Sequence, residues 1–495
     1  MKKRIVLFIL MLSLILTPAF VSQVVTEANN DELQMITSLL SPLIATTNYE
    51  DDWPEDWPPA RTWRVGHRDV MVEVNGEMLE FYDQWPVIVD GRTLVPVRYV
   101  FEHMGFEVGW DPISRQITLS NEDYEVLLTI DSAEFTTNGV VHTLDVPAQV
   151  TWHGRTLIPI RAVLESVGHY VGWDSIQRVV VVSSTPITLI TIRGEQLRTT
   201  LTWLHLEFDL TSEELALISE LTNLTWLVVN GRQINNIEPL SNLTNLELLN
   251  IGNMQITDLT PLTNLTNLTQ LQLFDTQVRD ITPLSNLTNL TTLTINGAQV
   301  EDLSPLAELT SLEYLHISHA EVADLSPLAN LINLERLFLS QNRISNVAPL
   351  AGLTNLDALW LDDNQIMDIS PIAEISNLRS LHLTSNRVTD ISPLSNLNNL
   401  SGLLLTDNQI SNITPLSDII SLVGLHLNNN QISDITALTN LRGLSFLDLS
   451  DNQITDISPL AGMMGLWQLR LAGNPIVDWS PIAHIDAHRV IGLPE

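Results

Sequence analysis

Residues 441–460 read LRGLSFLDLSDNQITDISPL, and this stretch decides the fold. It belongs to a 22-residue unit that recurs twelve times from Leu221 to His484 without insertion or deletion. Apolar residues occupy positions 1, 4, 7, 9, 14, 17 and 20 of almost every unit. One such unit cannot bury its apolar side chains alone. The units are therefore expected to stack, with each L-x-L core forming a short strand of a parallel sheet.

This spacing is that of leucine-rich repeats. The unit closely resembles the 22-residue repeat of internalin-like bacterial surface proteins, including the Pro-Leu ending of nearly every copy. The resemblance implies a horseshoe-shaped solenoid with short 3-10 or irregular segments on its convex side. We expect the twelve repeats at 221–484, an N-terminal cap at 186–220 with a helix opened by Thr211, and a C-terminal cap at 485–495.

Two polar positions recur inside the unit. Position 16 is always Asp or Asn, from Asn236 to Asp478, and a turn cap is a better explanation than a metal ligand in every unit. Position 12 is Asn only in the last seven units, and a buried asparagine ladder there would satisfy backbone groups from turn to turn. These structural residues are Asn342, Asn364, Asn386, Asn408, Asn430, Asn452 and Asn474. The pattern predicts that the C-terminal half of the repeats is held together more tightly than the N-terminal half.

Residues 64–185 contain a different, single duplication. GRTLVPVR at 91–98 returns as GRTLIPIR at 154–161, and VGWD at 108–111 returns as VGWD at 171–174. Each copy is expected to supply a tight turn, a strand, a short helix ending at glycine and a hairpin. The proline in each strand favours an edge position, because it cannot donate a ladder hydrogen bond.

The two octapeptides and two VGWD motifs resemble the copper amine oxidase N-terminal-like, or stalk, domain of exported bacterial proteins. That resemblance implies a duplicated α+β spacer or envelope-binding module, not oxidase activity. The complete fold class is therefore an α+β duplicated stalk-like domain followed by a leucine-rich-repeat solenoid with a parallel β-sheet.

The N-terminal residues predict export. A basic start is followed by an apolar run from Ile5 to Leu16, so 1–28 is expected to be a signal peptide, leaving no membrane span after its removal. Residues 29–63 are acidic and rich in Trp and Pro, which is typical of a tether. The protein is expected to be secreted or at the cell surface of a Gram-positive bacterium.

Composition excludes several kinds of chemistry. The chain has no cysteine, and its only lysines are Lys2 and Lys3. Thiol catalysis, zinc–thiolate sites and lysine nucleophiles are therefore excluded from the mature protein. A net charge of -35 argues against a nucleic-acid partner. We expect no enzyme activity, no cofactor and no catalytic residues, and a cell-wall-modifying enzyme is the less favoured alternative.

Binding residues are expected on the concave face, where positions 6 and 8 of each unit point outward. The repeat does not require large side chains there, yet aromatic and arginine residues of the kind found in binding hot spots cluster on neighbouring strands. The candidates are Tyr314, His316, Arg336, Phe338, Trp360, His382 and Phe446. His316, His382 and His426 share position 8, but strands spaced about 4.8 Å apart hold them roughly 10 Å or more from one another, too far for one metal ion.

The sequence therefore predicts a non-enzymatic secreted or surface protein. Its repeats would bind an unknown protein ligand through the concave face, displayed by the stalk-like module. An alternative is an envelope-binding spacer whose stalk-like domain holds cell-wall polymer.

Overall fold

The computed structural model describes residues 70–82, 84–151, 154–175 and 178–492. The expected signal peptide and tether lie outside these residues. The term repeat domain is used below for 221–484, and duplicated domain for the described part of 64–185. The boundaries assigned from the sequence stay predictions.

The repeat domain contains one strand per unit in a 14-stranded parallel sheet, with β16 (Trp203–Asp209) at one edge and β29 (Val490–Ile491) at the other. Five strands have five residues: β17 (Trp226–Asn230), β18 (Leu248–Gly252), β19 (Gln270–Phe274), β20 (Thr292–Asn296) and β21 (Tyr314–Ser318). Seven have three residues: β22 (Arg336–Phe338), β23 (Ala358–Trp360), β24 (Ser380–His382), β25 (Gly402–Leu404), β26 (Gly424–His426), β27 (Phe446–Asp448) and β28 (Gln468–Arg470). Neighbouring strands pair at an offset of one unit, which confirms the expected parallel sheet.

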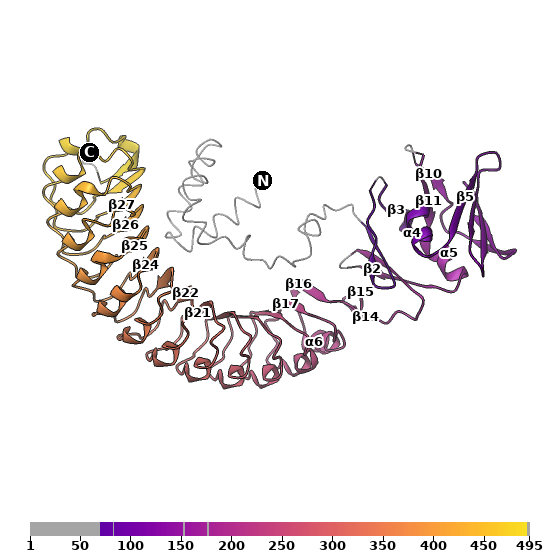
Figure 1. Ribbon diagram of the computed structural model, residues 1–495, viewed down its shortest axis with the longest axis horizontal. Helices are drawn as coiled ribbons and strands as arrows, with labels where there is room; N and C mark the ends of the chain where they lie inside the picture. Colours follow the sequence, from indigo (N-terminus) through magenta and orange to yellow (C-terminus); the bar gives the residue numbers. More distant parts are fainter. Residues whose placement is uncertain (1–69, 83, 152–153, 176–177, 493–495) are drawn as a thin grey trace. The chain divides into compact units, whose positions relative to one another are not determined.

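Short 3-10 helices lie on the opposite side of each unit from the strands (Figure 1). They are η2 (Glu238–Asn242), η3 (Thr260–Leu262), η4 (Thr282–Leu284), η5 (Ser304–Leu306), η6 (Ser326–Leu328), η7 (Ala348–Leu350), η8 (Ser370–Glu374), η9 (Ser392–Asn396), η10 (Thr414–Leu416), η11 (Thr436–Asn440), η12 (Ser458–Leu460) and η13 (Ser480–Ile482), with η14 (Ala487–Arg489) after the last unit. Leucines from both sides meet in one continuous core, as Leu381 and Leu394 illustrate with no exposed surface. The expected leucine-rich-repeat solenoid is confirmed.

The position-16 residues cap these 3-10 helices. Asp324 is typical, because its carboxylate accepts hydrogen bonds from the backbone N–H of Ser326 at 2.9 Å and from its hydroxyl at 2.7 Å. These two bonds lower the pKa of the Asp324 carboxyl below its usual value. The same backbone contact forms in the first unit, at Asn236, and in the last, at Asp478. The turn-cap interpretation is confirmed.

Strand length follows the residue at position 12. All seven units with Asn there have the three-residue strand, and the five units without it have the five-residue strand. Asn386 shows the cause: its amide donates to the carbonyls of Leu361 at 2.9 Å and Leu383 at 3.2 Å. It also accepts from the backbone N–H of Ile366 at 2.9 Å. The side chain therefore binds backbone groups that would otherwise hydrogen-bond to the neighbouring strand, and the strand ends earlier.

Backbone amide protons are expected to exchange more slowly in the C-terminal half of the repeat domain than in its N-terminal half. Amide protons bonded to asparagine side chains, such as those of Ile344 and Ile410, should exchange more slowly than their counterparts in the first five units. The physical reason is that a buried side-chain bond opens only when two neighbouring turns separate. Residue-resolved exchange with NMR or mass spectrometry measures this difference. Equal protection in both halves would contradict it, and would indicate that the longer N-terminal strands compensate fully.

Both ends of the sheet are covered. At the N-terminal end, α6 (Ser212–Ile218) begins at Thr211, whose hydroxyl accepts from Glu214 N–H while the Glu214 carboxylate accepts from Thr211 N–H. This capping box confirms the expected helix start. The hairpin of β14 (Leu189–Ile192) and β15 (Glu195–Arg198) adds three apolar side chains, including Ile192, to the core of the repeats. At the other end, β29 pairs with β28.

The duplicated domain repeats its elements 63 residues apart, as in α4 (Val97–His103) and α5 (Ile160–Ser166). Its strands are β1 (Met71–Val74), β2 (Glu77–Met78), β3 (Val87–Val89), β4 (Arg92–Pro96), β5 (Glu107–Asp111), β6 (Gln116–Ser120), β7 (Glu125–Thr129), β8 (Glu134–Thr137), β9 (Val140–Thr143), β10 (Gln149–Val150), β11 (Thr156–Pro159), β12 (Tyr170–Asp174) and β13 (Val179–Ser183). They form sheets of order β12-β13-β1-β2, β10-β11-β4-β3 and β5-β6-β7-β8-β9.

The two octapeptides pair with each other, since β4 and β11 are antiparallel neighbours. The expectation that they are edge strands is wrong, because β3 and β10 lie outside them. Proline is tolerated for another reason. Pro96 and Pro159 are the last residues of their strands, immediately before α4 and α5, and neither is paired with the outer strand.

The two copies exchange their N-terminal strands. β1 and β2 of the first copy join β13 of the second, while β8 and β9 of the second join β7 of the first. The sheets differ at one point. β7 pairs with β6, but its counterpart β14 does not pair with β13 and instead forms the hairpin with β15. The sheet that contains β12 and β13 therefore has one strand fewer than the sheet that contains β5 and β6.

Candidate functional site

The register of the sheet places six of the seven expected binding residues on four adjacent strands. Tyr314 and His316 lie on β21, directly opposite Arg336 and Phe338 on β22. Phe338 is opposite Trp360 on β23, and Trp360 is opposite His382 on β24. Phe446 lies apart on β27, where its ring packs edge-on against Trp467 at 5.7 Å. The candidate site is therefore centred on β21–β24, and Phe446 belongs to a separate pair.

The aromatic side chains on these strands are in continuous contact. The centroids of Phe338 and Trp360 are 4.3 Å apart, and those of Trp360 and His382 are 4.6 Å apart with planes only 4° from parallel. Tyr314 and His316 both meet Phe338 edge-on, at 5.3 and 5.7 Å. We call these five residues the ring ladder. Rings on neighbouring strands can meet because the strands are about 4.8 Å apart; Trp360 and His382 are stacked, whereas the contacts of Tyr314 and His316 with Phe338 are edge-on.

Burial divides the ring ladder into two kinds of residue. Phe338 and His382 keep only 8% and 6% of their surface exposed, so both mainly support their neighbours. Trp360, Tyr314 and His316 are partly exposed. In the free protein, a ligand on this face would therefore meet Trp360 and Tyr314 more than Phe338.

Hydrogen bonds fix the far end of the ladder. The hydroxyl of Ser380 lies 3.3 Å from Nε2 of His382 and accepts from the indole N–H of Trp360 at 3.4 Å. Nδ1 of His382 is 3.7 Å from the Asp362 carboxylate. Burial opposes ionisation of Asp362, but the nearby His382 imidazole and a hydrogen bond from the Thr384 N–H outweigh it and hold the pKa of that carboxyl below its usual value. A buried polar network thus fixes the orientation of His382 and Trp360.

Small residues at position 6 lie beside the large ones at position 8. After Arg336, the next four strands carry only Ala358, Ser380, Gly402 and Gly424 at this position. Nothing lies within 4 Å of the place where Gly424 would bear a Cβ atom. Sequence reasoning missed this row and also missed Asp362. A search of position 6 for small residues, as well as for large ones, would have found this row.

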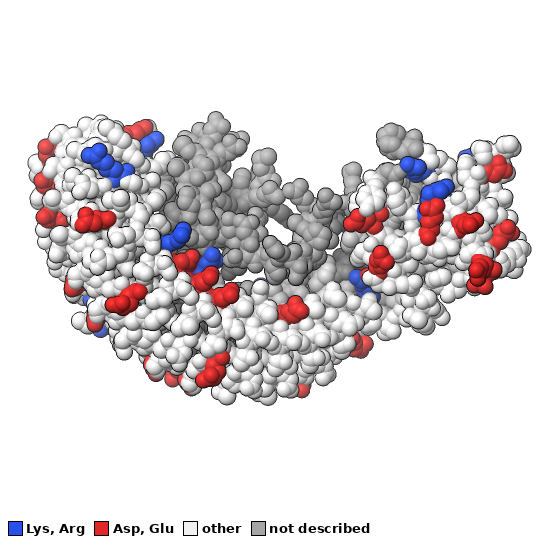
Figure 2. Space-filling model, viewed as in Figure 1, with Lys and Arg blue, Asp and Glu red and all other residues white. Residues whose placement is uncertain are grey.

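Charge around the site is mixed. Arg336 lies 3.9 Å from the carboxylate of Asp357, so its charge is compensated locally. Figure 2 shows that most of the face in view is uncharged and that arginine forms only a few separate spots. The described residues contain no group of three or more His, Asp or Glu side chains able to hold a metal ion. His316, His382 and His426 lie on separate strands, as expected.

The duplicated domain and the repeat domain each match a model of a known protein family. Residues 73–182 match the family model of the copper amine oxidase N-terminal domain. A family model that comprises two leucine rich repeats matches this chain at four places: residues 244–286, 266–308, 332–374 and 420–462. No curated protein matches the chain.

Several solved structures are similar. An internalin (inlF) of Listeria monocytogenes is 38% identical, with a TM-score of 0.58, over 61% of this chain and 91% of that one. Internalin C2 (inlC2) of the same species is 39% identical over 37% and 80% of the two chains, with a TM-score of 0.35. A leucine-rich-repeat protein of Leptospira interrogans is 24% identical over 56% and 77%, with a TM-score of 0.49.

The parallel sheet with one strand per unit and the 3-10 helices on the opposite side define a leucine-rich-repeat protein. The identity and coverage of the first internalin go further: the chain belongs to the internalin family, and it carries a copper amine oxidase N-terminal domain before the repeats. Among the described residues, no helix has the length and apolar character needed to cross a membrane.

Proposed function

We propose that this protein acts by binding and not by catalysis, and that the ring ladder on the concave face of the repeats is its main contact for a protein ligand. The observation that carries the proposal is the unbroken contact of five rings across four strands, at positions where the repeat has no structural need for them. Pre-ordered aromatic side chains lose little conformational entropy on binding, which is why they dominate interface hot spots.

The proposal includes display outside the cell. The basic and apolar start of the sequence favours export, and the internalin-like repeats favour a surface or secreted location. The duplicated domain would hold the repeats away from the envelope. Fractionating producing cells into medium, wall and membrane tests this part of the proposal, and retention in the cytoplasm would contradict it.

Substitution of Trp360 tests the binding face. The ligand is first captured on immobilised protein and identified, and its affinity is then measured by calorimetry. Trp360→Ala is expected to weaken binding about thirtyfold, because a hot-spot residue contributes about 2 kcal/mol. Ile420→Ala is the matched control, since Ile420 is large, apolar and 70% exposed but lies outside positions 6 and 8. Equal affinity of the Trp360 variant and wild type would reject the ring ladder as the binding surface.

A further inference from the structure

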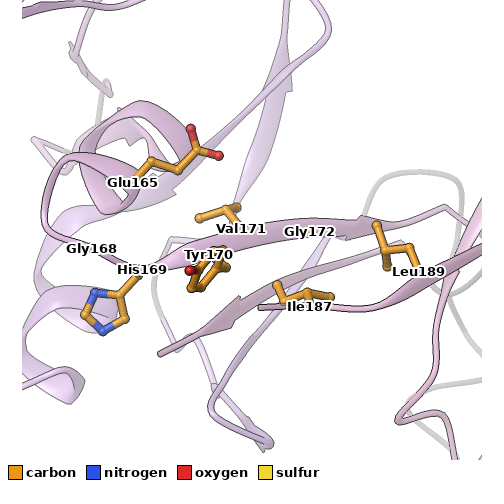
Figure 3. A pocket seen from close by; sticks show the side chains of 8 residues that line it. All are labelled: Glu165, Gly168, His169, Tyr170, Val171, Gly172, Ile187 and Leu189. Atoms are coloured by element: carbon orange, nitrogen blue, oxygen red, sulfur yellow. The ribbon is translucent and has the colours of Figure 1, made fainter. Parts of the chain in front are cut away.

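The second copy of the duplicated domain contains a surface pocket. It has a volume of about 440 Å³ and lies between the turn from α5 to β12 and the segment leading into β14. Figure 3 shows Glu165 and His169 at one end, Ile187 and Leu189 at the other, and Tyr170 between them. The pocket therefore combines an apolar wall, an aromatic ring and two groups able to form hydrogen bonds.

His169 is the unusual residue of this pocket. Its Nδ1 atom is buried and has no hydrogen-bond partner among the described residues. Buried polar atoms are almost always bonded, so an unbonded one calls for an explanation. The first copy shows that the fold does not need a polar group here. Phe106 occupies the equivalent place 63 residues earlier, is 4% exposed and packs edge-on against Phe101 at 5.6 Å.

The neighbouring position, Tyr170, also differs between the two copies. Tyr170 is 46% exposed, whereas the first copy has Glu107 at this place. Ile187 and Leu189 line the pocket because β14 lies outside the sheet, whereas β7 of the first copy is bound within it. A buried imidazole nitrogen without a partner, an exposed aromatic ring and a displaced strand thus coincide where the described sheets of the two copies differ.

The lining indicates the chemistry of a ligand. It contains no arginine or lysine, and its only acidic group, the Glu165 carboxylate, lies 3.9 Å from Arg161, whose charge it already compensates, so the lining favours an uncharged ligand over an anion. An apolar wall beside a tyrosine face suits the CH face of a pyranose ring and a small methyl group. Glu165 can accept from hydroxyl groups, and the partly exposed imidazole of His169 can bond to an amide. We propose that this pocket binds an uncharged N-acetylated hexose unit of a glycan chain.

This proposal does not depend on the ring ladder, and it gives the duplicated domain a binding role of its own. The test uses the full chain and isothermal titration calorimetry with three probes: chitotetraose, a peptidoglycan-derived N-acetylglucosamine–N-acetylmuramic acid disaccharide, and cellotetraose. Saturable binding of either acetylated probe, with binding of cellotetraose at least about tenfold weaker, is expected because only the former carry the acetamido group. The tighter of the two acetylated probes identifies the source of the glycan.

Three variants make the test specific. Tyr170→Ala and His169→Phe are each expected to weaken binding about tenfold or more, since each removes a stacking or hydrogen-bonding contact. His169→Phe restores the residue of the first copy, so thermal melting should show a domain at least as stable as wild type. Tyr82→Ala removes an aromatic residue that is 78% exposed elsewhere in the same domain and should bind normally. Absence of binding by all three probes, or equal binding by wild type and His169→Phe, would overturn the proposal.

Discussion

Replacement of Asn386 by alanine is expected to lower the free energy of unfolding of the repeat domain by about 4 kcal/mol. The amide of Asn386 is 8% exposed and donates to the carbonyls of Leu361, Leu383 and Thr384. Its oxygen accepts from the backbone N–H of Ile366. Alanine leaves the Ile366 N–H buried and without a partner, which costs about 1–3 kcal/mol. The three carbonyls keep their bonds from Asn364, Asn408 and the Asp363 N–H, so each loses one bond only, and the cavity left by the side chain adds to the cost. Urea unfolding followed by circular dichroism measures the change.

The first five units provide the control for this experiment. Position 12 is Thr276 in the third unit and alanine in the fourth and fifth, at Ala298 and Ala320. The Thr276 hydroxyl is buried and has no hydrogen-bond partner among the described residues, so Thr276→Ala should cost about 1 kcal/mol or less. Similar losses for Asn386→Ala and Thr276→Ala would show that position 12 acts only through packing.

The local consequence of the Asn386 substitution is equally specific. Repeat domains gain their stability from nearest-neighbour contacts, so the damage should be greatest in the two units that share the side chain. Amide exchange is therefore expected to accelerate at Ile366 and in its immediate neighbours, with little change in the first five units.

The sequence was sufficient to predict the sheet, because a fixed 22-residue spacing determines which residues share a column. The spacing alone therefore assigns His316, Phe338 and Trp360 to one surface, and the pairing of the strands agrees. Their burial could not be predicted in the same way. The exposure of Phe338 depends on rings supplied by both neighbouring strands, and that contact is a property of three units together.

The duplicated domain shows a different limit of sequence reasoning. The paired octapeptides indicated the duplication, but proline at the end of a strand was mistaken for a sign of an edge. Pro96 lies past the end of the outer strand, so it breaks no ladder bond on that side. The exchange of β1 and β8 between copies also left no local signal, because both sheets bury the same alternating apolar residues.

Mild acid is expected to destabilise the repeat domain through His316. Burial lowers the pKa of its imidazole from 6.5 to about 4, and the charge of His319 acts in the same direction. The surroundings explain this shift: Nε2 is 2.9 Å from the Ser318 hydroxyl, and the ring meets Phe338 edge-on. None of these contacts supplies the negative charge that a protonated ring would need.

The sign of the effect follows from proton linkage. Below about pH 6.5 the unfolded chain binds a proton at His316, whereas the folded protein does not bind it until the pH approaches 4. Stability is therefore complete above pH 6.5 and falls between these two values, by about 2 kcal/mol at pH 5. Urea unfolding at pH 7.5 and pH 5.0 measures this loss for wild type.

His316→Phe separates this residue from the others that titrate in acid. Burial also lowers the pKa of His426, although the negative charge of Asp448 opposes that shift, so some acid sensitivity should remain in the variant. The variant is expected to lose about 2 kcal/mol less than wild type between pH 7.5 and pH 5.0. His488→Gln, at an exposed histidine of the last 3-10 helix, should behave like wild type. If His316→Phe and wild type lose the same stability, His316 must already accept a proton in the folded state, and the ring ladder would then carry positive charge when it binds its ligand in acid.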